Sequence, residues 1–491
     1  MYETFLADLG AALPLVLVAV MGIVVVLVDS FRNDAPVIPW LAAGSLVIAL
    51  VLEVLQVGDP DVAFYGQLYT GGFASYVNAV ILLGALGSVL LSAPYLRQTG
   101  HNYGEVHALI LFATAGMMML ASSASLVSVF VGLETMSICL YVLTGLVREA
   151  PRANESALKY FLLGAFSTGF FLYGIALIYG ATGTMTLAEM PAAFAVTGRE
   201  GLLYAGLGLL LIGFFFKVSA VPFHMWTPDV YQGAPTTLTG FMSTTSKASA
   251  FAALILVLSV GLPFALGQWY LAVAVVAAVT MVLGNVLAIS QSNVKRMLAY
   301  SSIAHAGYVL TGIAAGSAEG YSGALYYLLA YTLMNLGAFG VMALLEWDGE
   351  QGAEQTLDSL AGVGYRRPVL GVTMGVFMFA LTGFPPLAGF IGKYKVFAAA
   401  IATGDLLWLA VVGVVASIVS AFYYLRVLVA FWMRDPEEAA AGAREAAFPV
   451  SSVAVAVLVF CAVALLGLGV LPGGVLELTD AFFEVRFVAG G

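Results

Sequence analysis

The sequence predicts an all-α polytopic membrane protein with about 14 transmembrane helices. Of its 491 residues, 62% are hydrophobic and only 9% are charged, whereas about 25% of the residues of an ordinary soluble domain are charged. Its 18 lysines and arginines cannot solvate the surface of a 51.3 kDa particle, so most of the exterior has to face hydrocarbon. The mean hydropathy of +1.00 agrees with this. A soluble globular protein is excluded.

Charge and cysteine content restrict the partners and cofactors. The formal net charge is −10 and the pI is about 4.9, and the basic residues are scattered, so no surface is predicted that could follow a nucleic-acid backbone. Cys139 and Cys461 lie inside apolar runs, whereas an iron–sulfur cluster needs about four thiolate or imidazole ligands. We therefore expect no nucleic-acid partner, and no cofactor or metal site in this chain.

The individual helices are predicted from apolar runs. A hydrocarbon core about 30 Å thick requires roughly 20 apolar residues per helix. Such runs, separated by Gly, Pro, Asn, Asp or charge, occur 14 times. The first opens with MYETFLADLG, which is acidic where a secretory signal would be basic, so we expect it to be retained. The runs lie near 5–28, 38–57, 74–95, 106–123, 125–147, 155–180, 201–230, 236–260, 268–290, 297–316, 320–345, 369–402, 406–433 and 450–472.

Basic residues are distributed unevenly between the loops. Because Lys and Arg are retained on the cytoplasmic side, their distribution predicts that both termini lie on the outer side. Ten follow odd-numbered helices: Arg32, Arg97, Arg148, Arg152, Lys295, Arg296, Arg366, Arg367, Arg434 and Arg444. Two lie on the opposite side, Arg199 and Arg486. The other six fall within predicted helices: Lys159, Lys217, Lys247, Lys393, Lys395 and Arg426.

Two weak echoes indicate an internal repeat. Residues 157–160 (ALKY) recur as 324–327 (ALYY), an offset of 167, and Pro222 and Pro386 interrupt helices seven and twelve at an offset of 164. A shift of five helices inverts the second copy in the membrane, and inverted repeats with broken helices are typical of transporters. The predicted units are 1–104 (helices one to three), 105–262 (first repeat, helices four to eight), 263–434 (second repeat, helices nine to thirteen) and 435–491 (helix fourteen).

Charged residues are predicted near the middle of the membrane in both repeats. A charge at this depth costs about 2.5 to 3.5 kcal/mol even on lenient scales, so it is a candidate functional group. Any one of them could instead be a structural ion pair or a satisfied core histidine, but this explanation weakens when several occur together. The candidates are Glu134 in helix five, Lys217 in helix seven, Lys247 in helix eight, His305 in helix ten and Lys393 in helix twelve.

Hydroxyl residues accompany these charges. Thr236, Gly240 and Ser243 share a helix face with Lys247, and Ser301, Tyr308 and Thr311 share one with His305. Such hydroxyls could simply bond back to carbonyls of their own helix. A row of hydroxyl side chains (a hydroxyl stripe) that ends at a charged residue is more consistent with a water-filled path through the membrane.

The prolines leave backbone carbonyls unpaired. Pro222 cannot donate to the carbonyl of Val218, nor Pro386 to that of Thr382, so water or protein has to satisfy these acceptors. Lys393 lies seven residues after Pro386, within about 20° of the same helix face. We therefore expect the breaks and the lysines to border one path.

Lys217 and Glu134 together could control whether a proton is bound or released. Burial disfavours the charged form of a lysine, and a carboxylate about 6 Å away favours it by roughly 3 kcal/mol at an effective dielectric near 20. If the two are neighbours, a change in their separation would make Lys217 bind or release a proton. Lys247 and His305 could then pass it sideways, and Lys393 could release it on the other side.

Four stretches of the sequence resemble a known family. They are ALKYFLLGAFSTGFFLYGIALIYGATG, FKVSAVPFHMWTPDVYQGAPT, KRMLAYSSIAHAGY and GFPPLAGFIGKYKVF. They resemble the antiporter-like membrane subunits of proton-pumping NADH:quinone oxidoreductase (respiratory complex I), a family shared with Mrp-type cation/proton antiporters. The resemblance spans most of the chain and implies proton translocation by Glu134, Lys217, Lys247 and Lys393. Lysine at the last position favours the subunit N branch, because subunit M typically has glutamate there. The long lateral helix of subunit L is not expected.

The resemblance also implies what other subunits supply. NADH, flavin, iron–sulfur clusters and the quinone site would belong to partner subunits, and quinone reduction there would drive proton translocation here. The expected neighbours are the antiporter-like subunit M and small membrane subunits, in a bacterial inner (plasma) membrane.

Two other functions remain open at this stage. An Mrp-type antiporter could use the same lysines to exchange Na⁺ or K⁺ for protons. A cation site normally offers several oxygen ligands, and Glu134 is the only mid-depth carboxylate predicted, which favours protons. If the chain were only an assembly scaffold whose buried charges no longer have a function, Lys217→Ala and Glu134→Ala variants would assemble and pump normally.

Overall fold

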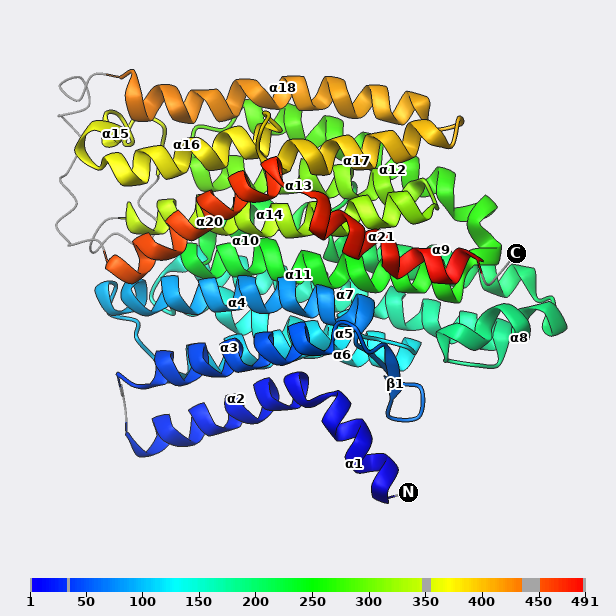
Figure 1. Ribbon diagram of the computed structural model, residues 1–491. Helices are drawn as coiled ribbons and strands as arrows, with labels where there is room; N and C mark the ends of the chain where they lie inside the picture. The colour runs from blue at the N-terminus through cyan, green and yellow to red at the C-terminus, as the bar shows by residue number, and fades with distance from the viewer. Residues whose placement is uncertain (1, 33–35, 347–354, 435–450, 489–491) are drawn as a thin grey trace.

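The structure is a computed structural model that describes residues 2–32, 36–346, 355–434 and 451–488. Figure 1 shows a bundle whose long helices run side by side along one axis. The long helices are α2 (Leu13–Phe31), α3 (Ile38–Gln56), α4 (Gly72–Gln98), α5 (Gly104–Ala121), α6 (Leu126–Thr144), α7 (Pro151–Thr182), α9 (Glu200–Lys217), α11 (Thr236–Leu256), α12 (Leu266–Ile289), α13 (Val294–Ala314), α14 (Ala318–Leu344), α16 (Pro368–Thr382), α17 (Ala388–Ala402), α18 (Leu407–Trp432), α20 (Ser452–Val470) and α21 (Gly473–Val488). The short ones are α1 (Tyr2–Ala11), α8 (Met190–Thr197), α10 (Trp226–Gly233) and α15 (Val363–Arg366), with single turns at 187–189, 257–261 and 263–265.

The predicted fold class, a helical polytopic membrane protein, is confirmed. In the part of the chain that is described, 12 helices are long and apolar enough to cross a membrane. The less apolar α13 and the pair α16 and α17 lie in the bundle beside them (Figure 1). The exact count of 14 spans and the inverted repeat stay predictions, with which this arrangement is consistent.

Helices seven and twelve are both interrupted at their prolines, as predicted. Helix seven consists of α9 and α10, with Pro222 in the non-helical segment between them. Helix twelve consists of α16 and α17, with Pro386 in the corresponding gap. Each of the two broken helices therefore carries a lysine near its break, Lys217 at the end of α9 and Lys393 in α17.

Several local features differ from the predictions. Residues 61–63 (β1) and 68–70 (β2) form a small antiparallel hairpin between α3 and α4, so the chain is not purely helical. The first predicted helix is divided into α1 and α2, because Pro14 begins a new helix after Ala12. Residues 473–488 form a further helix, α21, after the last predicted span at 450–472. Helix α21 packs on α14, and this contact explains why the moderately apolar segment of α21 is helical.

Glycines allow close packing between neighbouring helices. A Cβ atom at Gly116 of α5 would lie 2.6 Å from the Met136 backbone nitrogen of α6, and one at Gly174 of α7 would lie 2.6 Å from that of Leu210 of α9. Small residues let membrane helices approach closely enough for dispersion contacts to hold them together. At the centre, every residue of α11 is buried, so a lysine on this helix is far from any lipid.

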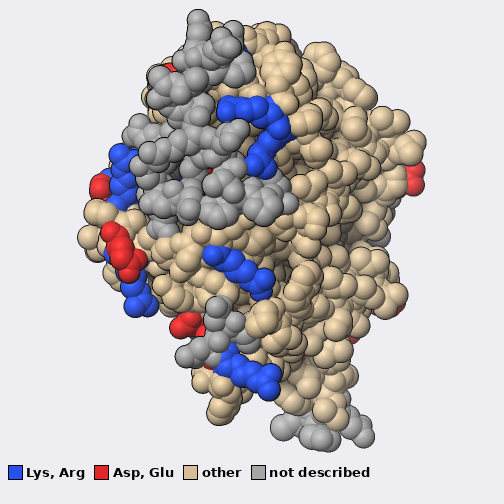
Figure 2. Space-filling view, turned by 90° about the vertical axis from the view of Figure 1, so that its left-hand side faces the viewer, with Lys and Arg blue, Asp and Glu red and all other residues tan. Residues whose placement is uncertain are grey.

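The two ends of the bundle differ. Both chain termini lie at the right-hand end in Figure 1. Lysine and arginine side chains gather on the opposite end, which faces the viewer in Figure 2. We call this the basic end; Arg32, Arg148 and Arg434 lie there in the loops that follow odd-numbered spans, and Arg97 and Arg366 lie in the last turns of α4 and α15. Arg444 lies outside the described residues, as does the side chain of Arg486.

Candidate functional site

Lys217 is enclosed between three helices of the first half. It is the last residue of α9, is 3% exposed and donates a hydrogen bond from Nζ to Ser137 Oγ of α6 at 2.7 Å. Its ammonium also lies over the rings of Tyr141 and Tyr160, 5.8 and 5.5 Å from their centroids, within the range of cation–π attraction. These contacts fix Lys217 toward α6 and α7 rather than toward its own helix break.

Glu134 lies one turn before Ser137 on α6. It is partly buried and accepts a hydrogen bond from Thr168 Oγ1 of α7 at 2.8 Å. Glu134 and Lys217 interact electrostatically, but no direct ion pair joins these two described residues. Thr168 and Lys217 line the same small cavity. The predicted pair is therefore brought together with a gap rather than in contact.

The segment after Lys217 is held by aromatic contacts. The Trp226 ring stacks on Tyr160 with centroids 4.5 Å apart, and its Nε1 donates to the carbonyl of Phe216 at 3.0 Å. A freed carbonyl at the end of α9 thus has a protein partner, as the break requires. The same Tyr160 ring contacts both Lys217 and the helix after the break.

Lys247 occupies the centre of the bundle. It is 2% exposed, and its Nζ donates to both the carbonyl and the Oγ of Ser302 in α13, each at 2.6 Å. Ser302 Oγ also accepts from Tyr331 OH at 2.8 Å, and Asn335 Nδ2 donates to Tyr331 OH at 3.0 Å and to Ser243 Oγ at 2.7 Å. A continuous hydrogen-bonded chain therefore leads from Lys247 through α13 and α14 and back to α11.

His305 adjoins this chain one turn further along α13. Its Nδ1 is 2.7 Å from Tyr327 OH and its Nε2 is 2.9 Å from Tyr424 OH, which also bonds Ser301. The imidazole lies against the ring of Tyr331, 5.2 Å between centroids. Both ring nitrogens thus face hydroxyls that can donate or accept a proton.

Lys393 fills the second helix break. It is 4% exposed and belongs to α17, but its Nζ donates back to the carbonyls of Leu381 and Thr382 at the end of α16, at 3.0 and 2.9 Å, and to Ser417 Oγ at 2.8 Å. The Thr382 carbonyl is the acceptor that Pro386 was predicted to leave unpaired. Lys393 also lies 4.6 Å from the centroid of the Tyr308 ring. It borders a groove of about 560 Å³ between α17 and α18 whose lining includes the exposed Tyr394 and Ile418.

The five candidates form three groups. Glu134 and Lys217 form the first, and Lys247 and His305 share the network around Ser302 and Tyr331. Lys393 is connected to the His305 group through a row of aromatic residues that begins at Tyr308. Asn285 donates to Tyr308 OH and accepts from Tyr423 OH. The Tyr423 ring lies 4.4 Å, between centroids, from that of Tyr424, which bonds His305. No hydrogen bond within the described chain connects Lys217 to Lys247. The alternative for the hydroxyl stripes is also partly correct, since Ser243 of the first stripe and Thr311 of the second bond to carbonyls of their own helices.

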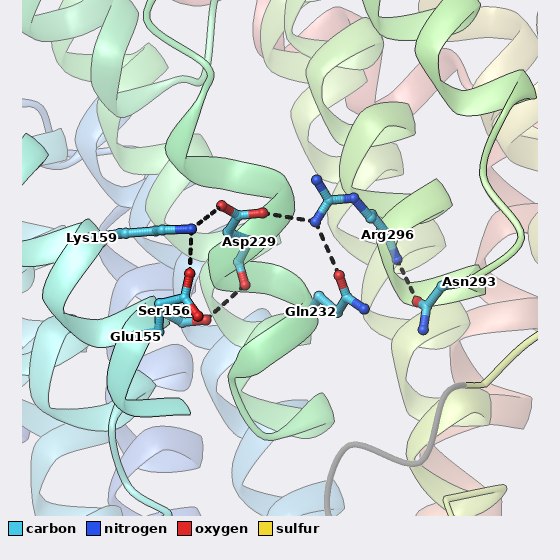
Figure 3. A network of polar contacts seen from close by, with 7 residues as sticks. All are labelled: Glu155, Ser156, Lys159, Asp229, Gln232, Asn293 and Arg296. Carbon is cyan, nitrogen blue, oxygen red and sulfur yellow. Dashed lines mark hydrogen bonds and ion pairs between the residues drawn. The ribbon is translucent and has the colours of Figure 1, made fainter. Parts of the chain in front are cut away.

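An ion-pair network lies near the basic end, outside these groups (Figure 3). Asp229 of α10 accepts from Lys159 of α7 at 2.7 Å and from Arg296 of α13 at 2.8 Å. Glu155 pairs with Lys159 at 2.6 Å, and Gln232 accepts from Arg296 at 3.0 Å. The short helix after the first break is therefore clamped between a helix of the first half and one of the second.

Some polar groups were not singled out in the sequence. Tyr327, Tyr331 and Asn335 are spaced by four residues in YYLLAYTLMN and form one face of α14, a pattern that could have been recognised. Glu53 of α3 is 4% exposed and accepts from Ser75 at 2.5 Å and Asn78 at 2.8 Å. Lys295 was placed in a loop, which is wrong: it lies in the first turn of α13 and is 5% exposed.

Comparisons with known proteins agree with this architecture. The family described as NADH:quinone oxidoreductase/Mrp antiporter, transmembrane, matches residues 123–420. NADH-quinone oxidoreductase subunit N of Salinibacter ruber is 60% identical over 493 residues, covering 99% of this chain and 98% of that protein. A chain of respiratory complex I from Thermus thermophilus, solved with bound aureothin, has a TM-score of 0.81 and 38% identity and covers 95% of this chain and 99% of its own. A chain of the Mrp complex from Dietzia sp. shares the fold, with a TM-score of 0.82 at 21% identity over 98% of this chain and 97% of that one.

The fold and the buried lysines define an antiporter-like membrane subunit. The chain belongs to the NADH:quinone oxidoreductase/Mrp antiporter family and, within it, to the subunit N family of NADH-quinone oxidoreductase. It is thus an antiporter-like, proton-translocating membrane subunit of complex I, and the Mrp-type antiporters are relatives.

Proposed function

We propose that Glu134, Lys217, Lys247, His305 and Lys393 carry the translocated protons. One observation supports this most directly. The three candidate lysines, Lys217, Lys247 and Lys393, donate to the serine hydroxyls of Ser137, Ser302 and Ser417, and none of the three has a carboxylate in direct contact among the described residues. A hydroxyl accepts from an ammonium but can rotate and donate to a neutral amine. Each site therefore tolerates both protonation states, which a fixed buried ion pair would not.

The three groups give the proposed order of transfer. Glu134 and Lys217 form the switch, in which their separation sets whether Lys217 holds its proton. Lys247 and His305 transfer protons sideways along the tyrosine-rich network, and Lys393 releases them through the second break. In this proposal the units are 1–104, 105–262, 263–434 and 435–491, and the two middle ones are inverted copies.

The remaining components belong to partner subunits in this proposal. NADH, flavin, iron–sulfur clusters and quinone bind elsewhere, and quinone reduction drives the movement of protons here. The neighbours are the antiporter-like subunit M and small membrane subunits. The basic end faces the cytoplasm of a bacterium and both termini face outward across the inner membrane, as the positive-inside rule implies.

The test is a Lys217→Ala variant in the intact complex, reconstituted into vesicles. We expect proton pumping per quinone reduced to fall severalfold while the assembly remains intact. Lys395→Ala is the matched control, because Lys395 is also a lysine beside a break but lies 3.7 Å from Asp480, a partly exposed carboxylate. Quinone reduction with unchanged pumping in Lys217→Ala would refute the assigned role. Arginine is unsuitable as a replacement because it does not give up its proton.

A further inference from the structure

A carboxylate at the basic end lies at the start of the hydroxyl stripe of α11. Glu346 follows the end of α14 and is partly buried. Its Oε2 accepts from Thr236 Oγ1 of α11 at 2.5 Å and from Tyr95 OH of α4 at 2.9 Å. Thr236 is the first residue of α11, the helix that carries Lys247. Glu346 is therefore positioned where the basic end meets the most deeply buried helix.

A buried lysine faces the same place. Lys295 of α13 donates from Nζ to the carbonyl of Ala234, two residues before Thr236, at 3.0 Å. It interacts electrostatically with Glu346 without a direct ion pair between these described residues. Among the described residues, the ionisable groups that interact with Glu346 are thus Tyr95 from α4 and Lys295 from α13. Lys295 offsets the negative charge from a distance, while Thr236 and Tyr95 hold the carboxylate by hydrogen bonds.

The inner part of the route is lined by hydrogen-bonded groups. Thr236 and Lys247 are eleven residues apart, or about 16 Å along the helix axis. Ser243 lies between them and accepts from the Asn335 amide, which also donates to Tyr331, and Tyr331 and Lys247 both donate to Ser302. Because an amide nitrogen does not relay a proton, a water beside Asn335 has to pass it from Ser243 to Tyr331 in this route. The stretch that no hydrogen bond bridges is the one from Thr236 to Ser243, about 10 Å along the axis.

This unconnected stretch is polar rather than sealed by hydrocarbon. Two buried side-chain atoms, Thr237 Oγ1 and Asn335 Oδ1, have no hydrogen-bond partner, and the buried Tyr231 OH interacts with Ser302 beside Lys247 without a close hydrogen bond. Tyr231 belongs to α10. Its backbone carbonyl accepts a hydrogen bond from Thr239 Oγ1 of α11, and its ring contacts the ring of Phe339 of α14. Buried polar atoms are almost always bonded to protein or to ordered water, so these atoms favour water here. Two or three waters, each about 2.8 Å from the next, would span the distance.

We propose that Glu346 takes up protons at the basic end and delivers them through Thr236 and this polar stretch to Lys247. In each cycle the carboxylate accepts a proton from water, passes it into the hydrogen-bonded chain and is ionised again, while the neutral amine of Lys247 becomes an ammonium. This inference rests on the proposed role of Lys247 as a proton carrier. Glu346 is then a proton-uptake residue in addition to the five candidates.

The experiment compares four variants of the intact complex in vesicles. Glu346→Gln removes the titratable group, and Glu346→Asp keeps it. Asp358→Asn is the matched control, because Asp358 is also an acid near the basic end but is 87% exposed and paired with Arg434. Lys247→Ala tests the proposed function in parallel. Proton pumping and quinone reduction are measured with and without formate, a small weak acid that can carry protons to a site that has lost its carboxylate.

We expect Glu346→Gln to pump protons several times more slowly, with formate restoring a large part of the loss. Glu346→Asp should pump faster than Glu346→Gln, and Asp358→Asn should behave as wild type. Wild-type pumping by Glu346→Gln with defective Lys247→Ala would overturn the uptake role and leave the proposed function standing. Wild-type pumping by Lys247→Ala would overturn the proposed function itself. If Glu346→Gln loses assembly and activity in equal proportion and formate has no effect, its role is structural and the inference is wrong.

Discussion

The two broken helices place their lysines on opposite sides of the break. Lys217 is the last residue of the helix before the break, and its ammonium turns away toward Ser137 and two tyrosine rings. Lys393 belongs to the helix after the break and reaches back to cap the carbonyls of Leu381 and Thr382. The same chain interruption thus presents an ammonium bonded to a neighbouring helix in one half and a helix-capping ammonium in the other.

This difference changes what controls the charge of each lysine. In the first half a carboxylate, Glu134, lies near the ammonium without touching it. In the second half the negative end of the α16 dipole and two carbonyls take its place. A carboxylate can gain or lose a proton, whereas a helix terminus cannot. In the proposed order of transfer, the first half is therefore suited to switching, and the second to holding a proton before its release.

The largest expected effect comes from removing the two lysines, of which only Lys393 caps a helix end. Lys393→Met leaves the Leu381 carbonyl without its partner, which costs about 1 to 3 kcal/mol for a buried acceptor. Lys217→Met leaves Ser137 still bonded to the carbonyl of Leu133, so we expect a smaller loss. Both variants should pump poorly, but Lys393→Met should also lower the temperature at which the detergent-solubilised complex dissociates. Equal thermal stability of the two would contradict the capping role.

Most of the long helices and the two breaks could be predicted from the sequence, which also singles out the five candidate residues. Long apolar runs and isolated charges are strong local signals, and Pro222 and Pro386 mark the breaks because proline removes a donor. The prediction that Thr382 needs a partner followed from covalent structure alone, and Lys393 supplies it.

The connections between helices could not be predicted in this way. Ser302 became the acceptor for Lys247 only because α13 and α11 pack together, and nothing in SSIAHAGY distinguishes it from Ser301. Lys295 lies in α13 rather than in the predicted loop, and the first turn of α13 buries it while leaving the neighbouring Arg296 partly exposed. Such assignments depend on the rotation of each helix, which hydropathy does not fix when a helix such as α11 is buried on all sides.

A smaller effect is expected from neutralising the carboxylate of the first half. Glu134→Gln retains an oxygen that can accept from Thr168, so the fold and assembly should be preserved. The variant loses the negative charge that acts on Lys217, and we expect pumping to fall severalfold while quinone reduction continues. Glu200→Gln, at an exposed position at the start of α9, is the control. Unimpaired pumping by Glu134→Gln would remove the proposed difference between the halves.

The smallest expected effect concerns the clamp that connects the halves. Asp229→Asn breaks the ion pairs of α10 with Lys159 and Arg296, all of which are about one third exposed, so water and salt screen them. Pairs of this kind are worth about 0 to 1 kcal/mol each. We expect thermal inactivation of the complex at slightly lower temperature in low salt, with the difference from wild type shrinking as ionic strength rises. If Asp229→Asn instead abolishes pumping at full stability, then α10 is held in place for transport rather than for cohesion, and the two halves are coupled through Asp229 as well as through the buried network around His305.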